Sequence, residues 1–144
     1  MLPLNVRLGH DDSKPYVRLE FAGFQHPEVA EPHGLDLLVC RVHASAQPVT
    51  ATFDVSVRVD ELLELREYLA TINSGNGPPA NLSLAGGVFT LSFAPSRRGP
   101  VLCAVHLKAV NASHVRLEYL VTLEPESITR SLAELELLER AAAE

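Results

Sequence analysis

The sequence predicts an α+β fold that is mostly antiparallel β-sheet, with about seven or eight strands, one helix in mid-chain and one at the C-terminus. Three observations lead to this class. Much of the chain alternates apolar and polar residues with a period of two, as strands with one buried face do. Two segments repeat apolar residues every three or four positions, which is typical of amphipathic helices. Short turns separate the strands, so we expect a meandering sheet, either single or folded into a sandwich.

Three strands are predicted before the first helix, at residues 16–24, 35–44 and 49–59. A sheet with one solvent-facing side is usually antiparallel, since parallel sheets are covered on both sides. The strand 35–44 begins apolar on both faces, so we expect it to be central and covered on both sides. The strand 49–59 alternates most regularly, and its polar face carries Thr50, Thr52, Asp54, Ser56 and Arg58.

The period changes to that of a helix at Asp60, and a helix is predicted over residues 60–73. Asp60 is the expected N-cap, because its carboxylate can accept a hydrogen bond from an unpaired N–H of the first turn. Asn73-Ser74-Gly75 ends the helix, since glycine readily takes the left-handed conformation beyond the last turn. The solvent side of this helix is an acidic face that includes Glu61, Glu64 and Glu67.

The second half of the chain repeats the order of strands followed by a helix. Strands are predicted at 81–85, 87–94, 101–110 and 115–123. Gly86-Gly87 forms a turn or a bulge between the first two of them. Pro125 stops the last strand and suits the first turn of a helix over about 126–142. Leu137 widens the apolar stripe of this helix, which can bury against the sheet or partly against another subunit.

Length and composition indicate one domain, residues 1–144, that can bury a core without a disulfide or a metal ion. The formal net charge is −6, which argues against binding to nucleic acid and favours a basic protein partner. The N-terminus has neither the basic nor the long apolar region of a signal peptide. No segment is apolar over the length of a membrane span. We therefore expect a cytoplasmic protein without membrane contact.

The two cysteines, Cys40 and Cys103, lie within apolar alternating runs and are expected to be reduced, buried thiols. Each is followed three positions later by a histidine, His43 or His106. Because an odd spacing in a strand places two side chains on opposite faces, neither pair can form a Cys–His dyad. The sequence leaves open whether the two cysteines touch.

No pattern of metal ligands or of cofactor binding is recognisable, so no cofactor is predicted. His26 and His33 flank a proline-rich segment, which is more simply read as a surface loop than as a metal clamp. His43 and His106 lie on the more polar faces of their strands and could approach one another across a sheet. Arg97-Arg98 is expected at a solvated turn, where it could hold an acidic partner.

Four segments follow one another in a familiar order: VSVRVDELLELREYLATI, LSLAGGVFTLSF, GPVLCAVHL and VRLEYLVTLEPESITRSLAELELL. Over about residues 16–138 this order resembles a group of small bacterial proteins, mostly uncharacterised, some of them immunity proteins to wall-associated toxins. The resemblance implies a cytosolic, non-catalytic protein that binds and neutralises a partner. It carries over no active-site residues.

The leading hypothesis is a non-catalytic, immunity-like protein-binding module that uses the polar face of the strand 49–59 or the acidic face of the helix 60–73. One alternative is a small-molecule-binding domain or enzyme whose site is assembled from distant strand residues. Another is a structural homo-oligomer formed through the C-terminal helix or a sheet edge. The candidate residues for the alternative site are Arg41, His43, His106 and Tyr119. The candidate surface residues are Arg41, His43, Asp54, Arg58, Arg97, Arg98 and His106.

Overall fold

The computed structural model describes residues 4–9, 14–24, 37–75, 77–96, 99–108 and 116–143. Within them it confirms the α+β class, with eight strands and two α-helices. The first four strands are β1 (Leu4–Leu8), β2 (Tyr16–Phe24), β3 (Leu37–Ala46) and β4 (Val49–Arg58). The second four are β5 (Ala80–Leu84), β6 (Phe89–Ala94), β7 (Val101–Lys108) and β8 (Arg116–Leu123). The helices are α1 (Val59–Asn73) and α2 (Pro125–Ala143), and a short 3-10 turn, η2 (Ala85–Gly87), joins β5 to β6.

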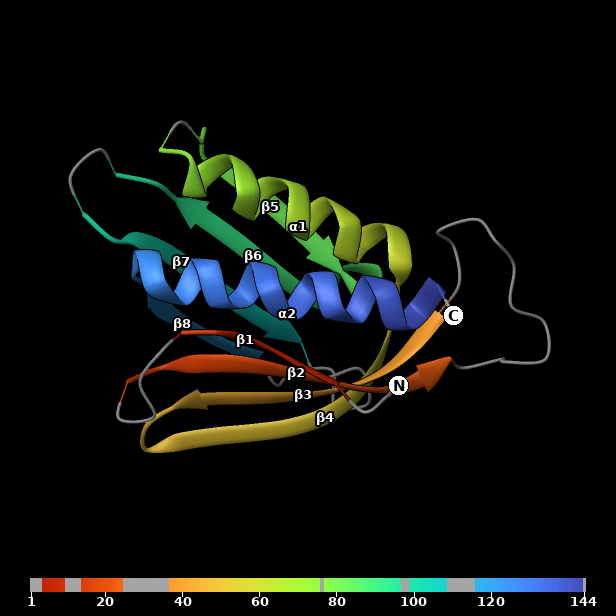
Figure 1. The fold of residues 1–144 in the computed structure, drawn as a ribbon. Coiled ribbons are helices and arrows are strands. Elements are labelled where there is room, and N and C mark those ends of the chain that lie inside the picture. The colour runs from red at the N-terminus through yellow and green to blue at the C-terminus, as the bar shows by residue number, and fades with distance from the viewer. Residues whose placement is uncertain are drawn as a thin grey trace.

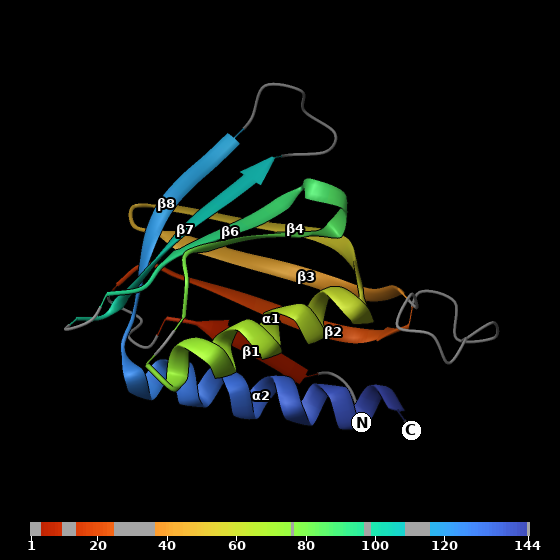
Figure 2. The same cartoon turned by 90° about the horizontal axis from the view of Figure 1, so that it is seen from above.

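The strands form two separate four-stranded antiparallel sheets, each in sequence order, which we call the first sheet (β1–β4) and the second sheet (β5–β8). The structure thus decides between a single sheet and two sheets. Figures 1 and 2 show α1 and α2 side by side along one side of the molecule, next to both sheets. The helices therefore cover apolar surface that the two sheets leave open between them.

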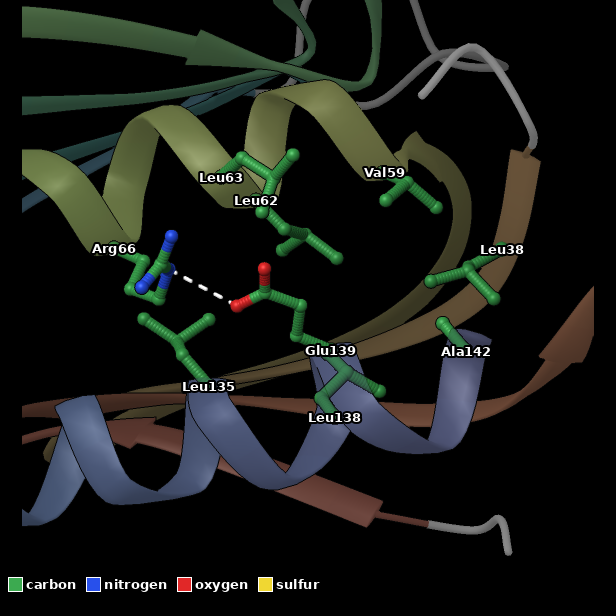
Figure 3. Close-up of a pocket in the computed structure, with 9 residues that line it drawn as sticks. All are labelled: Leu38, Val59, Leu62, Leu63, Arg66, Leu135, Leu138, Glu139 and Ala142. Carbon is green, nitrogen blue, oxygen red and sulfur yellow. Dashed lines mark ion pairs between the residues drawn. The ribbon is translucent and has the colours of Figure 1, made fainter. Parts of the chain in front are cut away.

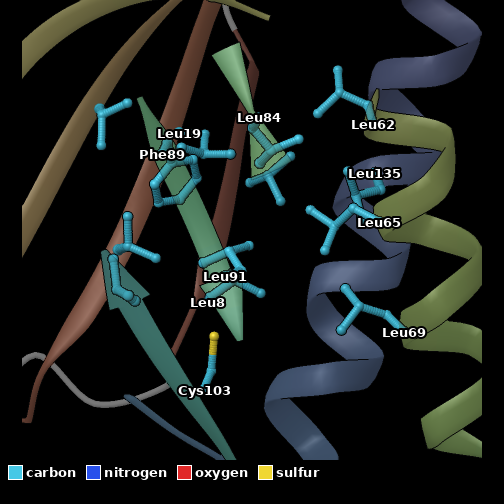
Figure 4. Close-up of a cluster of buried hydrophobic side chains, with 14 of the residues drawn as sticks. Leu8, Leu19, Leu62, Leu65, Leu69, Leu84, Phe89, Leu91, Cys103 and Leu135 are labelled. Carbon is cyan, nitrogen blue, oxygen red and sulfur yellow. The ribbon is translucent and has the colours of Figure 1, made fainter. Parts of the chain in front are cut away.

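The inward faces of both sheets and of both helices share one hydrophobic cluster. Figure 4 shows Leu65 of α1 and Leu135 of α2 directed toward core residues of the two sheets, among them Leu19 and Phe89. Leu65, Leu19 and Phe89 are at most 1% exposed. Burial of this kind contributes about 25 cal/mol for each Å² of apolar surface removed from water, so the shared cluster holds the two sheets together.

One edge of the first sheet is covered by α2. The backbone N–H of Arg7 in β1 donates to Glu134 Oε1 at 2.9 Å, and the Ser131 hydroxyl donates to the Arg7 carbonyl. Edge strands otherwise offer free N–H and C=O groups to other chains. Two polar side chains on the buried side of α2 thus replace the strand that β1 lacks on this edge.

Several details differ from the sequence predictions. The strand β1 is not predicted, although Leu4, Val6 and Leu8 alternate with Asn5 and Arg7. The prediction of Asp60 as the N-cap is wrong: α1 begins at Val59, and the cap is Arg58, whose N–H donates to Glu61 Oε1 at 2.9 Å. Asp60 instead accepts a 3.0 Å bond from Arg58 Nε. The chain passes from β4 to α1 without a loop, so the helix starts as soon as the strand ends.

One prediction about burial needs correction as well. β3 is central in its sheet, but its second face is not covered, since Val39 is 36% exposed. Leu137, which the sequence places beside the main stripe of α2, is 51% exposed. That stripe is used within the chain, because Ile128, Leu135 and Leu138 are all buried.

Candidate functional site

The outer side of the first sheet carries a set of polar side chains that we call the charged face: Asn5, Arg18, Glu20, Arg41, His43 and Asp54. They point outward because their neighbours along each strand, such as Leu19, Cys40 and Val42, are buried in the core. The strand register places Glu20, Arg41 and Asp54 in one row across β2, β3 and β4. Arg18, His43 and Thr52 form the next row.

Each charge of this face has an opposite or polar partner on the adjacent strand. Arg41 makes a two-pronged contact with Asp54, with Nε–Oδ1 at 2.9 Å and Nη2–Oδ2 at 3.4 Å. His43 Nε2 lies 2.9 Å from Glu20 Oε1. On the β1 side, Arg18 Nη1 donates to Asn5 Oδ1 at 2.9 Å. The contacts hold the side chains in defined positions on an open surface.

The partners also shift the ionisation of the charged face. The hydrogen bond from His43 lowers the pKa of Glu20, and the hydrogen bond from Arg41 lowers the pKa of Asp54. In return, the hydrogen bond to Asp54 raises the pKa of Arg41. Glu20, Arg41 and Asp54 therefore remain charged at neutral pH and in mild acid, and the face presents both signs of charge.

Chemically, the charged face can recognise the surface of a partner. A metal site would need several His, Cys, Asp or Glu side chains in a group, and no such group exists among the described residues. Arg41 and Asp54 retain 56% and 60% of their side-chain exposure, so both are open to a partner. Val39 adds an exposed apolar contact next to Arg41 on the same side of β3.

The four candidate residues of the alternative site lie on two different sheets, Arg41 and His43 on the first, His106 and Tyr119 on the second. His106 lies on the outer side of the second sheet, where its Nδ1 is 3.3 Å from Glu118 Oε1. It is therefore no neighbour of His43 across a sheet. Tyr119 points inward, and its hydroxyl donates to the Tyr16 carbonyl at 2.9 Å. This bond links the second sheet to the first, and burial raises the pKa of the Tyr119 phenol.

The remaining candidate residues fall in two groups. Arg58 stands exposed at the end of β4 and pairs with Asp60. Arg97, Arg98, His26 and His33 lie outside the described residues.

Both cysteines lie on the opposite side of their strand from the histidine three positions later, as predicted. Cys40 and Cys103 are fully buried and free, whereas His43 and His106 are on the outer sides of their sheets. Burial raises the pKa of each thiol to about 12. Since the thiolate is the nucleophile, these cysteines are unreactive in the folded chain.

Neither of two hollows in the described structure has a candidate site residue in its lining. Figure 3 shows a narrow gap between α1 and α2, lined by leucines and closed by an Arg66–Glu139 ion pair at 3.0 Å. Its volume of about 10 Å³ is no more than the space of one water molecule. A larger hollow of about 200 Å³ lies where α1 ends and α2 begins. The described residues around it, such as Ile72, Leu123 and Ile128, include no titratable side chain.

Sequence reasoning did not select Asn5, Arg18 and Glu20 as site residues. Arg18 and Glu20 alternate with buried neighbours in β2, and this alternation assigns them to a polar face. Their pairing with His43 and Asn5 depends on which strands are adjacent. The sequence pattern does not contain that information.

Comparison with known proteins places the chain in a family. The model of the Immunity protein WapI-like family matches residues 7–141. This chain belongs to that family. The match confirms the resemblance to immunity proteins that the sequence order suggests, and it gives the chain an immunity-like, protein-binding role. No curated protein and no solved structure matches the chain. Among the described helices, none is long and apolar enough to cross a membrane.

Proposed function

We propose that this protein is a bacterial, cytoplasmic immunity protein that binds a toxin protein through the charged face and neutralises it without catalysis. In this proposal residues 1–144 act as one domain. The observation that carries the choice of surface is the ordered row formed by Glu20, Arg41 and Asp54, which stands open on the first sheet.

A surface of this kind favours specific recognition of a protein. Its charged groups are already held by neighbours, so binding requires little further ordering of side chains. Arginine is among the residues that most often dominate binding energy at interfaces, and Arg41 is central in the row. Each arginine or carboxylate that becomes buried must meet an opposite charge on the partner. The alternation of signs on the charged face thus selects against surfaces that lack the matching pattern.

The distribution of charge supports a basic toxin. α1 contains four acidic residues and one basic residue, and α2 contains four acidic residues and two basic ones. The two helices therefore have a net charge of −5, out of −6 for the whole chain. A field of this sign accelerates the approach of a basic partner, most strongly at low ionic strength. The helices would steer the toxin, and the charged face would make the specific contacts.

The first experiment identifies the partner and then measures its binding. The immobilised chain is used to capture proteins from extract of the native cell. A retained polypeptide counts only if a gene next to this chain's gene encodes it and if co-expression of the chain relieves its toxicity. Binding of the purified polypeptide is then measured for the wild type, Arg41→Glu and Glu64→Lys. Both variants change an exposed side chain by two charge units.

We expect Arg41→Glu to weaken binding by about 30-fold or more, as the loss of a central interface residue does. Glu64→Lys is the matched control on α1, and we expect it mainly to slow association at low salt. Thermal unfolding of both variants checks that the fold is kept. If Glu64→Lys abolishes binding and Arg41→Glu does not, the acidic face of α1 is the contact surface. If no neighbouring gene product binds, the proposal of an immunity function fails.

A further inference from the structure

The free edge of the second sheet is the surface of this protein that the proposed function leaves unused. Strand β8 ends that sheet, and within the described part of the chain it packs extensively only against β7. Figure 2 shows it as the outermost strand of its sheet. Of the other edge strands, β1 is bound by α2, whereas η2 and α1 contact only parts of β4 and β5.

This edge also carries apolar side chains on its outer side. Leu120, in the middle of β8, is 57% exposed, and Leu102 on the adjacent β7 is 42% exposed. The register places Leu120 opposite Ala104 and Leu102 opposite Thr122, so the two leucines are diagonal neighbours. An unpaired strand with an exposed leucine at its centre is the kind of edge that pairs with another strand.

We infer that β8 pairs with β8 of a second copy of this chain, antiparallel about a two-fold axis at Leu120, and joins the two second sheets into one. With the axis at this residue, Leu120 faces Leu120 of the second copy. Glu118 faces Thr122, and Arg116 faces Glu124. Outward side chains thus stay opposite outward side chains, as the pleat of a sheet requires.

The charges on β8 select this register over its neighbours. An axis at Val121 would place Glu118 opposite Glu124, and an axis at Glu118 would place two copies of that glutamate together. An axis at Tyr119 would place Glu118 opposite Leu120. Only the axis at Leu120 forms two Arg116–Glu124 pairs and a leucine contact. Arg116 and Glu124 are both exposed, and neither has an ion pair within the described part of the chain.

The contact is small, so the dimer is expected to be weak. A strand of eight residues spans about 26 Å, and one pair of strands buries less surface than a standard stable interface. We expect a dissociation constant on the order of 10 to 100 µM. Analytical ultracentrifugation of the full chain between about 1 and 500 µM covers this range.

A charge exchange tests the register. Arg116→Glu and Glu124→Arg each place like charges opposite one another twice per dimer, and each should raise the dissociation constant about tenfold. The double variant R116E/E124R restores both pairs in the opposite direction, and its dissociation constant should return to within about threefold of the wild type. The unfolding temperature of each variant shows whether the fold is intact. A wild type that stays monomeric at all concentrations overturns the inference. So does a double variant whose dissociation constant is no lower than those of the single variants.

A cross-link provides a second, independent test. Directly opposite residues of an antiparallel pair have Cα atoms about 4.5 to 5.5 Å apart, within the range of a disulfide. Leu120→Cys should therefore form a covalent dimer when treated with an oxidant such as oxidised glutathione. Leu137→Cys is the matched control, since Leu137 is 51% exposed but lies on α2. The native cysteines are buried and do not interfere. Equal cross-linking of the two variants would contradict the pairing through β8.

Discussion

Gly9 is a position at which a single added methyl group should cost much stability. It follows β1 with a φ of +102°, a conformation that residues with a side chain rarely adopt. A Cβ atom at this position would lie 2.9 Å from Tyr16 Cβ and 3.1 Å from Val121 Cγ1. Val121 belongs to β8, so Gly9 marks a place where the two sheets meet closely.

The expected cost of Gly9→Ala has two parts. The positive φ contributes about 1–2 kcal/mol, because a side chain strains the backbone there. The contacts contribute a further ~1–3 kcal/mol, since overpacking displaces neighbours that have little room to move. Gly87 is the matched control: its φ is +91°, and a Cβ there would meet nothing within 4 Å. Gly87→Ala should therefore lose only the stability that the positive φ costs.

Urea denaturation at 25 °C, followed by far-UV circular dichroism, measures both variants, because the chain has no tryptophan for fluorescence. If the dependence of the free energy of unfolding on urea concentration (the m value) is unchanged, the shift in midpoint gives the change in the free energy of unfolding. We expect Gly9→Ala to be less stable than Gly87→Ala by ~1–3 kcal/mol. If the two differ by less than about 0.5 kcal/mol, the close approach of β8 to the end of β1 is refuted.

Three further predictions concern the core and the charged face. Burial raises the pKa of Cys40 and Cys103 from 9.0 to about 12 in the folded chain. Above pH 9.0 the thiols therefore ionise in the unfolded chain before they do so in the folded one. The free energy of unfolding then falls by up to ~1.4 kcal/mol per pH unit for each thiol. Urea unfolding at pH 9.5–11 should show a shallower pH slope for Cys40→Ala, and an unchanged slope would contradict the burial. Leu65→Ala should cost about 2–5 kcal/mol, since this fully buried residue lies among both sheets and α2; a midpoint like that of the wild type would contradict its place in the core. A double-mutant cycle on Arg41 and Asp54 should give a coupling of about 1 kcal/mol or less to stability, because both side chains are exposed; a much larger coupling would assign the pair a structural role.

The elements of this fold could be predicted where the sequence carries a long local signal. The alternation in residues 49–59 and the helical spacing around Leu62, Leu65 and Leu69 both appear in the structure within two residues of their predicted limits. β1 is missed, although its five residues alternate apolar and polar side chains. The start of α1 is misplaced, since Asp60 is a good cap by type, but β4 runs straight into the helix at Val59.

The sequence likewise predicts only part of the candidate site. That Asp54 and Arg41 lie on polar faces, and that Cys40 is separated from His43, follows from the two-residue period of a strand. That Glu20 binds His43, and that His43 and His106 belong to different sheets, depends on which strands are neighbours. The solvated turn expected at Arg97 and Arg98 stays a prediction, because both residues lie outside the described part of the chain.

The sequence by itself therefore determined the class of fold, the two helices and the side of most strands that faces water, because these features repeat along a few consecutive residues. Only the tertiary structure decided that the strands form two sheets, that α2 covers the edge of β1 and that β8 pairs on one side only within the described part of the chain. These features depend on contacts between segments as far apart as Arg7 and Glu134. Such contacts are selected by how the apolar faces fit together over the whole chain, and no local period records that fit.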